Sequence, residues 1–531
     1  MASPAFRKLS LLTLLVSLAT LAGAQSFRVQ CPTSTITHPN AANNNSEPAY
    51  TAPTTMAPGA GGYLAPTANV NGAIKCQQIS GGDGYATMGD GTQTYMFSFG
   101  PLSGLADIAA GRPGTQFPNV FNTPLAGTPM PGDPATTNGA SDVSGYSPGT
   151  LGGFTYNGAV GQVPDADNGG VIDGHVDPRQ IMDVGVMNGN IPAPLIAIDE
   201  DDEFFLTLTN VGMIMRPDLF EQHTVHFHGY PNASSFYDGV PDASVAINIG
   251  GSFTYYYLAP DAGTYFWHCH ITPPEHLQMG MVGQLYVRPR QNRVPAGAIL
   301  YTALQQQEGD LRTACNSASD IVCTNPLPFS SNTATRAATG NYAYNDGDGS
   351  TYYDVEYPIQ IHGFDPNFHF VGMTFNPEGF ADMKDKYFLL NGRSYPDTVS
   401  TGPMATQSSD GTMHYSQPLP SIINIPAGKK ALLRISDLDV SEFQTLASLG
   451  IPMQVIAINA KLLRDQAGNN LYYNTNSITL GGGESLDVIL DASDTTKYPS
   501  GSVFYLYTPN LDHLSNDAEN FGGLMTEVHI N

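Results

Sequence analysis

Short apolar runs, each ended by turn residues, are the feature of this sequence that most restricts its fold. Between residues 186 and 290, the pairs Asp238-Gly239 and Gly250-Gly251 are typical turn signals between such runs. The runs are too short for ordinary helices and follow one another at the spacing typical of a β-sandwich. The strands expected in this region are 195–198, 204–208, 224–228, 252–258, 263–268 and 283–287.

A second group of short apolar runs lies towards the C-terminus and predicts a second sandwich. The composition agrees, because 56 glycines and 40 prolines disfavour a helical bundle. We therefore expect an all-β protein with two sandwich domains. The strands expected in the second region are 387–390, 431–435, 453–458, 485–490 and 503–507.

The stretch before the first sandwich is rich in Gly, Pro, Ala, Thr and Asn and has few periodic apolar runs. We expect a loop-rich extension that packs partly on the first domain and carries one or two strands, such as 94–99. A polar stretch between the sandwiches is the best candidate for a linker. The expected division is a signal peptide at 1–24, the extension at 25–180, the first domain at 181–290, the linker at 291–354 and the second domain at 355–531.

The N-terminus has the three parts of a secretory signal. Residues 7–8 (Arg-Lys) are basic, residues 9–21 are apolar, and residues 22–24 (Ala-Gly-Ala) have the pattern of a cleavage site. We expect cleavage near Ala24 and a secreted protein, either periplasmic or extracellular; an uncleaved N-terminal anchor is the alternative. No later segment approaches the roughly 18 unbroken apolar residues of a membrane span, so none is expected.

The charge balance limits the partners. The formal net charge is −26, from 21 Lys and Arg against 47 Asp and Glu. So acidic a balance argues against nucleic acid or an anionic membrane surface as a partner.

Five cysteines are present, and export permits disulfides. Cys31 and Cys76 flank a polar segment, while Cys315 and Cys323 bracket a short loop. These are the natural pairs, although the sequence leaves other pairings open. Cys269 remains. An odd cysteine in an exported protein is a reactive thiol, an intermolecular bridge or a metal ligand, and here its neighbours decide.

Two His-x-His pairs lie close to Cys269 in the pattern of strands. Residues two apart on a strand share a face, so His226 and His228 project together, as do His268 and His270. Each pair can hold one metal or two adjacent metals. Cys269 lies between the second pair and points to the opposite side of its strand.

On that opposite side Cys269 can meet His223, His276 and Met281. Two imidazoles, a thiolate and a thioether are the ligands of a blue-copper electron-transfer site; zinc more typically takes further cysteines or a carboxylate. The alternative, core histidines around a buried thiol, is disfavoured because six of the thirteen histidines gather in residues 223–276. The sequence therefore predicts a copper site.

These motifs resemble those of the multicopper oxidase family. Asn-Gly-Asn-Ile-Pro-Ala-Pro-Leu-Ile at 188–196 looks like the opening of that family's first cupredoxin domain, and His-Phe-His-Gly at 226–229 follows in the family's order. Gly-Thr-Tyr-Phe-Trp-His-Cys-His at 263–270 continues it. Further motifs extend the similarity over about 186–531, at 238–241, 390–396, 432–435 and 483–488.

The resemblance implies two cupredoxin-like Greek-key sandwiches with the blue-copper ligands in the first, as in two-domain multicopper oxidases and copper nitrite reductases. It also implies that the peptide bonds between Cys269 and its flanking histidines connect two copper sites. The implied type 1 copper ligands are His223, Cys269, His276 and Met281. The implied half of a type 2/type 3 copper cluster is His226, His228, His268 and His270.

The second domain departs from the family, because it has no His-x-His pair to complete an eight-histidine cluster. Residues 451–459, where a pair is expected, contain no histidine. His513 resembles the ligand that a neighbouring nitrite reductase subunit supplies to a second copper. However, His226 and Asn459 stand where that enzyme has the Asp and His that protonate nitrite, so nitrite reduction is disfavoured.

We therefore expect a secreted copper-dependent oxidoreductase of the multicopper oxidase type, in which type 1 copper passes electrons to a second copper centre and on to dioxygen. The expected donor is a small molecule or a small redox protein, and the resemblance implies a homotrimer. The alternative from another class is a non-catalytic blue-copper electron carrier or a secreted copper-binding protein.

Overall fold

A computed structural model describes most of the two expected domains. The expected signal peptide and the expected Cys315–Cys323 bridge lie outside the described residues. The described residues are 31–32, 34–39, 47–59, 62, 64–102, 117–118, 120–121, 189–213, 215–216, 219–229, 235–249, 251–259, 261–307, 332–371, 379–407 and 413–531.

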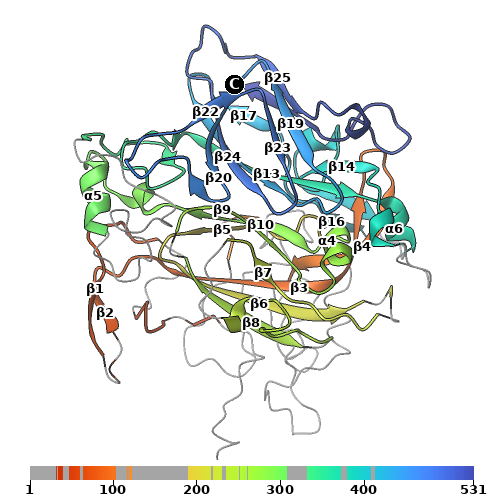
Figure 1. Cartoon of the computed structure of the whole chain (residues 1–531), viewed down its shortest axis with the longest axis horizontal. Helices are drawn as coiled ribbons and strands as arrows, with labels where there is room; N and C mark the ends of the chain where they lie inside the picture. The colour runs from red at the N-terminus through yellow and green to blue at the C-terminus, as the bar shows by residue number, and fades with distance from the viewer. Residues whose placement is uncertain are drawn as a thin grey trace, which may run out of the picture.

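Two β-sandwiches, one above the other in Figure 1, make up the fold. Apolar side chains from both sheets of the first sandwich, such as Phe97, Leu206 and Trp267, meet in one buried core. One sheet has the order β4 (Gln93–Pro101), β3 (Ile74–Thr87), β6 (Glu203–Gly212), β8 (Ser252–Leu258). The other has the order β5 (Ile196–Asp199), β10 (Val282–Arg288), β9 (Gly263–His268), β7 (His226–Phe227).

In the sheet β4-β3-β6-β8, the strands β3 and β4 come from residues before 181, where the first domain was expected to begin. β3 pairs in parallel with β6 and antiparallel with β4. The expected strand at 94–99 lies within β4, but β3 is not among the expected strands. Its stretch Gly-Gly-Asp-Gly at 81–84 is typical of a turn, because these residues are depleted in strands. The first sandwich therefore begins well before residue 181, and the segment 74–101 is part of it rather than a loop-rich extension.

The second sandwich contains all five strands expected for it, and its core is formed by side chains such as Leu433, Val455 and Val528. Its larger sheet has the order β14 (Tyr387–Leu390), β13 (Val355–Phe364), β18 (Lys430–Asp437), β24 (Ser485–Asp491), β20 (Met453–Ile458), β21 (Lys461–Leu462), with β22 (Tyr473–Thr475) paired to β20. Its smaller sheet has the order β17 (Ile423–Ile425), β26 (Met525–Ile530), β25 (Val503–Tyr507), β19 (Gln444–Leu449), β23 (Ser477–Leu480).

The sheet that carries β9 and β10 faces the larger sheet of the second sandwich, as Figure 1 shows. The Thr264 hydroxyl on β9 donates to Asp487 Oδ1 on β24 at 2.6 Å. The Gln284 amide on β10 donates to Ser436 Oγ on β18 at 2.7 Å. These side chains are buried, and buried hydrogen bonds of this kind fix the orientation of packed surfaces. The C-terminal end of β9 is thereby held beside the second sandwich.

Short elements complete the described structure. The remaining strand pairs are β1 (Thr55–Pro58) with β2 (Leu64–Ala68), β11 (Asn341–Tyr342) with β12 (Tyr352–Tyr353), and β15 (Met404–Gln407) with β16 (Met413–Ser416). The helices are α4 (Pro273–Gln278), α5 (Leu300–Gln307) and α6 (Pro366–Val371). The 3-10 turns are η2 (Ser235–Tyr237), η3 (Arg290–Arg293), η4 (Phe380–Asp382), η5 (Asp397–Val399) and η6 (Leu511–His513).

Three of the cysteines, Cys31, Cys76 and Cys269, are among the described residues. Cys31 and Cys76 form a disulfide, which confirms this pair. Cys269 is free and buried. None of the described helices has the length and apolar character needed to cross a membrane.

Candidate metal centres

The end of β9 and the segments beside it carry a first cluster. Cys269 follows β9 directly, and His276 lies on α4, whose first two residues are prolines that favour a helix start. His223 is held by a β-bridge to Ile247. The ligand atoms of His223, Cys269 and His276 lie within 4.8 Å of one another, and all three residues are buried.

Met281 is tied to the same cluster through its backbone. The Cys269 N–H donates to the Met281 carbonyl at 3.1 Å, and the Met281 N–H donates to the His276 carbonyl at 2.8 Å. A Cβ placed on Gly81 would lie 3.2 Å from Met281 Cε and 2.5 Å from His223 Cδ2. The Met281 methyl group and the His223 ring therefore meet over Gly81, and the structure brings all four expected type 1 ligands together.

The Cys269 sulfur lies among hydrogen-bond donors. The Thr224 N–H donates to Sγ at 3.4 Å, and His276 Nδ1 lies 3.3 Å from it. Burial raises the pKa of Cys269, but the His276 charge and its hydrogen bond, with two backbone N–H groups, bring it below the ordinary value. The thiolate, which is the form that binds metals, is therefore favoured.

Buried ring nitrogens provide a test of whether copper fits. Within the described part of the chain, neither nitrogen of His223 nor Nε2 of His276 has a hydrogen-bond partner, although both side chains are buried. Buried polar atoms normally have a partner. Burial, with the His276 charge, holds the pKa of His223 well below its ordinary value, so that this ring is neutral, as a metal ligand must be. These two imidazoles, with the Cys269 thiolate and the Met281 thioether, fit copper of the blue type.

Glu221 connects the first cluster to the surface. Its Oε2 lies 3.7 Å from His276 Nε2, and its side chain is 26% exposed while that of His276 is fully buried. The interaction with His276 lowers the pKa of Glu221. Burial lowers the pKa of His276, but Cys269 and Glu221 raise it to about 9. Glu221 is not among the residues expected from the sequence, although its position two residues before His223 was a signal.

A second cluster lies where β7 meets β9. His226 pairs with His268 in the sheet, and the ligand atoms of His226, His228 and His268 lie within 4.8 Å of one another. The Nε2 atoms of His228 and His268 are 3.0 Å apart. Three of the four histidines expected at the second centre thus form one group.

Backbone carbonyl groups orient two of these rings. His268 Nδ1 lies 2.7 Å from the Cys269 carbonyl, and His226 Nδ1 lies 2.7 Å from the Asp238 carbonyl. With Nδ1–H donating in each case, the Nε2 lone pair is left for a metal. Burial lowers the pKa of His268 well below its ordinary value, and burial with the charge of His226 lowers that of His228 to about 4. The imidazoles of His228 and His268 are therefore neutral at neutral pH.

His270 lies beside this group. Its ring centroid is 5.1 Å from that of His226 and 5.4 Å from that of His268. Its backbone N–H donates to the Thr224 hydroxyl at 2.9 Å, which fixes the chain after Cys269. The ring can reach the same space, but its nitrogens do not belong to the 4.8 Å group.

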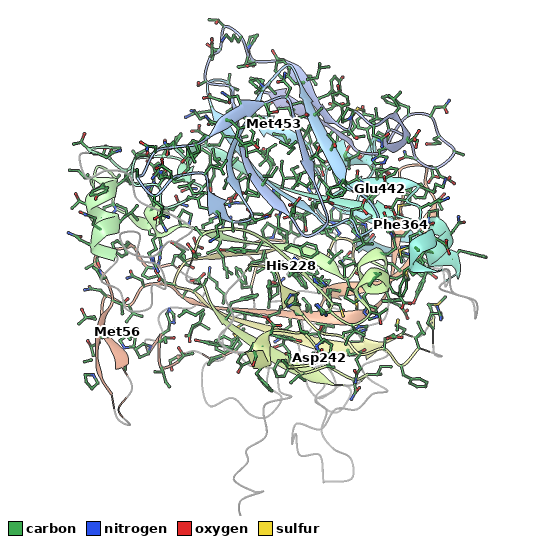
Figure 2. The ribbon with its side chains drawn as sticks, viewed as in Figure 1. Met56, His228, Asp242, Phe364, Glu442 and Met453 are labelled. Atoms are coloured by element: carbon green, nitrogen blue, oxygen red, sulfur yellow. A yellow bond between two sulfur atoms is a disulfide. The ribbon has the colours of Figure 1, made fainter. Side chains whose placement is uncertain are left out.

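A pocket of about 470 Å³ between the two sandwiches opens onto the second cluster. Figure 2 shows His228 at the boundary of the sandwiches. A Cβ on Gly483, which has a φ of +90°, would lie 3.0 Å from His228 Nδ1, so this loop of the second sandwich approaches the ring closely. The pocket is lined by His228, Phe266, His268, Pro273, Pro274 and Leu277 of the first sandwich and by residues 439–443 and 481–483 of the second.

His513, expected as a ligand offered to a neighbouring chain, lies outside both clusters. Its buried ring stacks on Phe388 with the centroids 3.8 Å apart. Its Nδ1 lies 2.9 Å from Gln444 Oε1 and its Nε2 lies 3.2 Å from Glu442 Oε2. Within this chain both ring nitrogens of His513 have partners in the second sandwich, and its role toward another chain stays a prediction.

The segment that carries both clusters also matches a known protein family. Residues 172–292 match the sequence model of the family described as multicopper oxidase. The laccase abr2 of Aspergillus fumigatus is 35% identical over 109 residues, which are 20% of this chain and 17% of that protein. The multicopper oxidase MmcO of Mycobacterium tuberculosis is 37% identical over 81 residues, which are 15% of this chain and 14% of that protein. The chain thus spans less than a fifth of the length of these relatives.

Among solved structures, the blue copper oxidase from Nitrosomonas europaea aligns with a TM-score of 0.47 at 17% identity, over 86% of each chain. The sandwich architecture and the His–Cys–Met donor set define a cupredoxin-type copper protein. The matched segment, residues 172–292, carries all the histidines and the cysteine of both clusters. Over this segment the chain is similar to multicopper oxidases, in agreement with the resemblance of the motifs.

Proposed function

We propose that the protein is a secreted copper-dependent oxidase that accepts electrons at the first cluster and delivers them to dioxygen at the second. One observation carries this proposal: Cys269 belongs to the first cluster, while its chain neighbour His268 belongs to the second. Copper held at both clusters supplies one-electron redox chemistry. Relatives named as laccase and multicopper oxidase support the same activity.

The residues of the first cluster hold and tune the site that accepts electrons. His223, Cys269 and His276 would hold the copper, and the Met281 thioether would be a further, weak ligand that adjusts the potential. The backbone hydrogen bonds that link Met281 to Cys269 and His276 keep the ligands in place without reorganisation. Glu221 offers a carboxylate near the surface where a donor, a small molecule or a small redox protein, can approach.

The residues of the second cluster form the site for the oxidant. His226, His228, His268 and His270 are the proposed ligands, and the Cys269 and Asp238 carbonyl groups orient two of these rings. The pocket beside His228 and His268 admits a molecule as small as dioxygen. Reduction of one dioxygen takes four electrons and four protons and yields two waters, so four one-electron donor oxidations complete a cycle.

Secretion and assembly belong to the same proposal. The Cys31–Cys76 disulfide suits an oxidising compartment, in line with the signal sequence expected at 1–24. Among the described residues, no histidine of the second sandwich joins the second cluster. The homotrimer implied by the resemblance would bring a neighbouring chain to that site, and light scattering of the purified protein tests for a mass of three chains.

Copper analysis with electron paramagnetic resonance and oxygen uptake with a phenolic donor test the oxidase. We expect two or more coppers per chain, blue absorption and oxygen consumption. His228→Ala should keep the blue absorption and abolish oxygen consumption, whereas His529→Ala, a histidine remote from both clusters, should change neither. One copper per chain with blue absorption and no oxygen consumption would instead identify a non-catalytic electron carrier.

A further inference from the structure

One serine hydroxyl contacts two buried carboxyl groups in the wall of the second sandwich. Ser441 Oγ forms a hydrogen bond with Asp385 Oδ2 and lies 2.9 Å from Asp439 Oδ1. Gly363 on β13 makes room for them: a Cβ there would overlap Asp385 Oδ2 and come within 2.6 Å of Asp439 Oδ2. The two carboxyl groups therefore share one small space beside Gly363.

The Ser441 hydroxyl contacts two carboxyl groups but carries only one hydrogen. A serine hydroxyl has one hydrogen and can donate to only one carboxylate, so the second contact of Ser441 needs a proton on a carboxyl group. The other donors to the two carboxyl groups are neutral amides. The Gln278 side chain donates to Asp385 Oδ1 at 2.9 Å, the Gln444 side chain donates to Asp439 Oδ2 at 2.6 Å, and the Ser441 backbone N–H donates to Asp439 Oδ1 at 2.8 Å. Burial and the charge of Asp439 raise the pKa of Asp385 well above its ordinary value. The protonated form of the Asp385 carboxyl group is therefore favoured.

Two pockets meet at this group. Asp439 and Ser441 line the pocket that also contains His228 and His268. Ser441 also lines a second pocket of about 600 Å³, together with Asp385. The remaining polar residues of that second pocket include Lys384, Lys386, Glu442, Asp512, His513 and Asp517. Asp385, Ser441 and Asp439 thus form a continuous hydrogen-bonded path from one pocket to the other.

We propose that Asp385, Ser441 and Asp439 form a proton relay that supplies the second cluster, an inference that rests on the proposed oxidase function. The Asp385 proton moves to the Ser441 oxygen while the Ser441 hydroxyl proton moves to Asp439. Asp439 then transfers its proton to water in the pocket that His228 and His268 line. Asp385 regains a proton from water in the second pocket, and the hydroxyl rotates back. One proton is transferred per cycle, and the three side chains return to their starting state.

Other titratable groups face the relay and must be considered in any pH dependence. Asp437 on β18 accepts the Asp439 N–H at 3.0 Å, and its pKa is raised well above the ordinary value by burial and by the Asp439 charge, with Glu484 adding to the effect. On β13, burial lowers the pKa of His362, against the opposing charge of Asp439. Glu442 follows Ser441 in the chain and its N–H points to Asp439 Oδ1 at 3.4 Å. None of these residues contributes the hydroxyl that links the two carboxyl groups.

Infrared spectroscopy of the metal-free full-length protein tests the shared proton without any activity. We expect a C=O stretching band of a protonated carboxyl group at neutral pH that Asp385→Asn removes. Asp365→Asn is the matched control: this buried aspartate accepts N–H groups at the start of α6, a place where asparagine caps equally well, and it should keep the band. An unchanged spectrum in Asp385→Asn overturns the relay.

The copper-loaded protein tests proton supply. Asp385→Asn and Ser441→Ala should slow reoxidation by dioxygen by ~10-fold or more, since a positioned proton donor typically contributes ~100-fold or more. Anaerobic bleaching of the blue absorption by the donor should keep its wild-type rate, and Ser441→Thr, which keeps the hydroxyl, should restore reoxidation. Wild-type reoxidation rates in both variants overturn the relay. A wild-type protein that takes up no oxygen instead overturns the oxidase function, while the infrared result still decides whether the shared proton exists.

Discussion

Gly81 of β3 lies directly against the ring of His223, so closely that a Cβ at position 81 would stand 2.5 Å from His223 Cδ2. The segment before the family motifs thereby forms part of the copper pocket. Gly81→Ala should displace the His223 ring or the strand, at a cost of about 1–3 kcal/mol typical of overpacking. We expect a shifted blue absorption band and a lowered thermal unfolding midpoint, measured on the copper-loaded protein.

Ser80→Ala is the matched control for this substitution. Ser80 is the preceding residue of β3, and its hydroxyl donates to the Gly100 carbonyl at 3.3 Å instead of facing the cluster. This variant should lose little stability and keep the absorption band. A Gly81→Ala protein with wild-type absorption and stability would show that β3 does not constrain His223.

Cys269→Ser should abolish the blue absorption, because serine does not supply the thiolate that gives a type 1 site its colour. The His226–His228–His268 group does not use the sulfur, so this second cluster should still bind copper. Metal analysis should then show the loss of one copper per chain with the rest retained. Blue absorption that survives in this variant contradicts the assignment of Cys269.

The strands that the sequence predicted best are those with strong apolar patterns between turn signals. The expected ranges 252–258 and 263–268 coincide with β8 and β9, and 453–458 coincides with β20. The expected strand 224–228 is present only as the short β7, and the neighbouring His223 forms an isolated bridge to Ile247. β3 escaped prediction because its glycines match no strand pattern, although they serve its close contact with His223.

The residues of the two clusters could likewise be predicted only in part. Period-two spacing on a strand was enough to predict that His226 and His228 share a face, and the free Cys269 marked the blue-copper ligands. The partners that come from distant parts of the chain could not be predicted, because their positions depend on packing between sandwiches. Gly483 at the His228 ring and Ser441 beside the pocket are examples.

Glu221→Gln should raise the reduction potential of the first cluster. A negative charge near a metal favours its oxidised, more positive state, and Glu221 Oε2 lies 3.7 Å from His276 Nε2. Spectroelectrochemical titration of the blue band measures the change, with Asp382→Asn on η4 as a control for loss of an exposed carboxylate. Equal potentials in Glu221→Gln and the wild type contradict this role.

Arg288 and Glu356 join the two sandwiches by an ion pair. Arg288 Nη2 on β10 lies 2.8 Å from Glu356 Oε1 on β13, and Arg434 Nε on β18 lies 2.8 Å from Glu356 Oε2. Burial raises the pKa of Glu356, but the charges of Arg288 and Arg434 bring it down to about 2. The carboxylate therefore stays charged in the folded protein at pH values where it takes up a proton in the unfolded chain.

Because the folded-state pKa is lowered, this carboxylate stabilises the fold fully above its ordinary pKa of 4.5, and the contribution is lost as the pH falls toward 2. Glu356→Gln should lower the free energy of unfolding at pH 7 by about 3–5 kcal/mol, since it removes the carboxylate charge that two buried guanidinium groups contact. Urea unfolding from pH 7 to pH 2.5 should show a steeper acid loss in the wild type than in the variant. Glu519→Gln, which removes an exposed carboxylate, should follow the wild type. Parallel acid curves for the wild type and Glu356→Gln would mean that this ion pair does not link pH to the stability of the joined sandwiches.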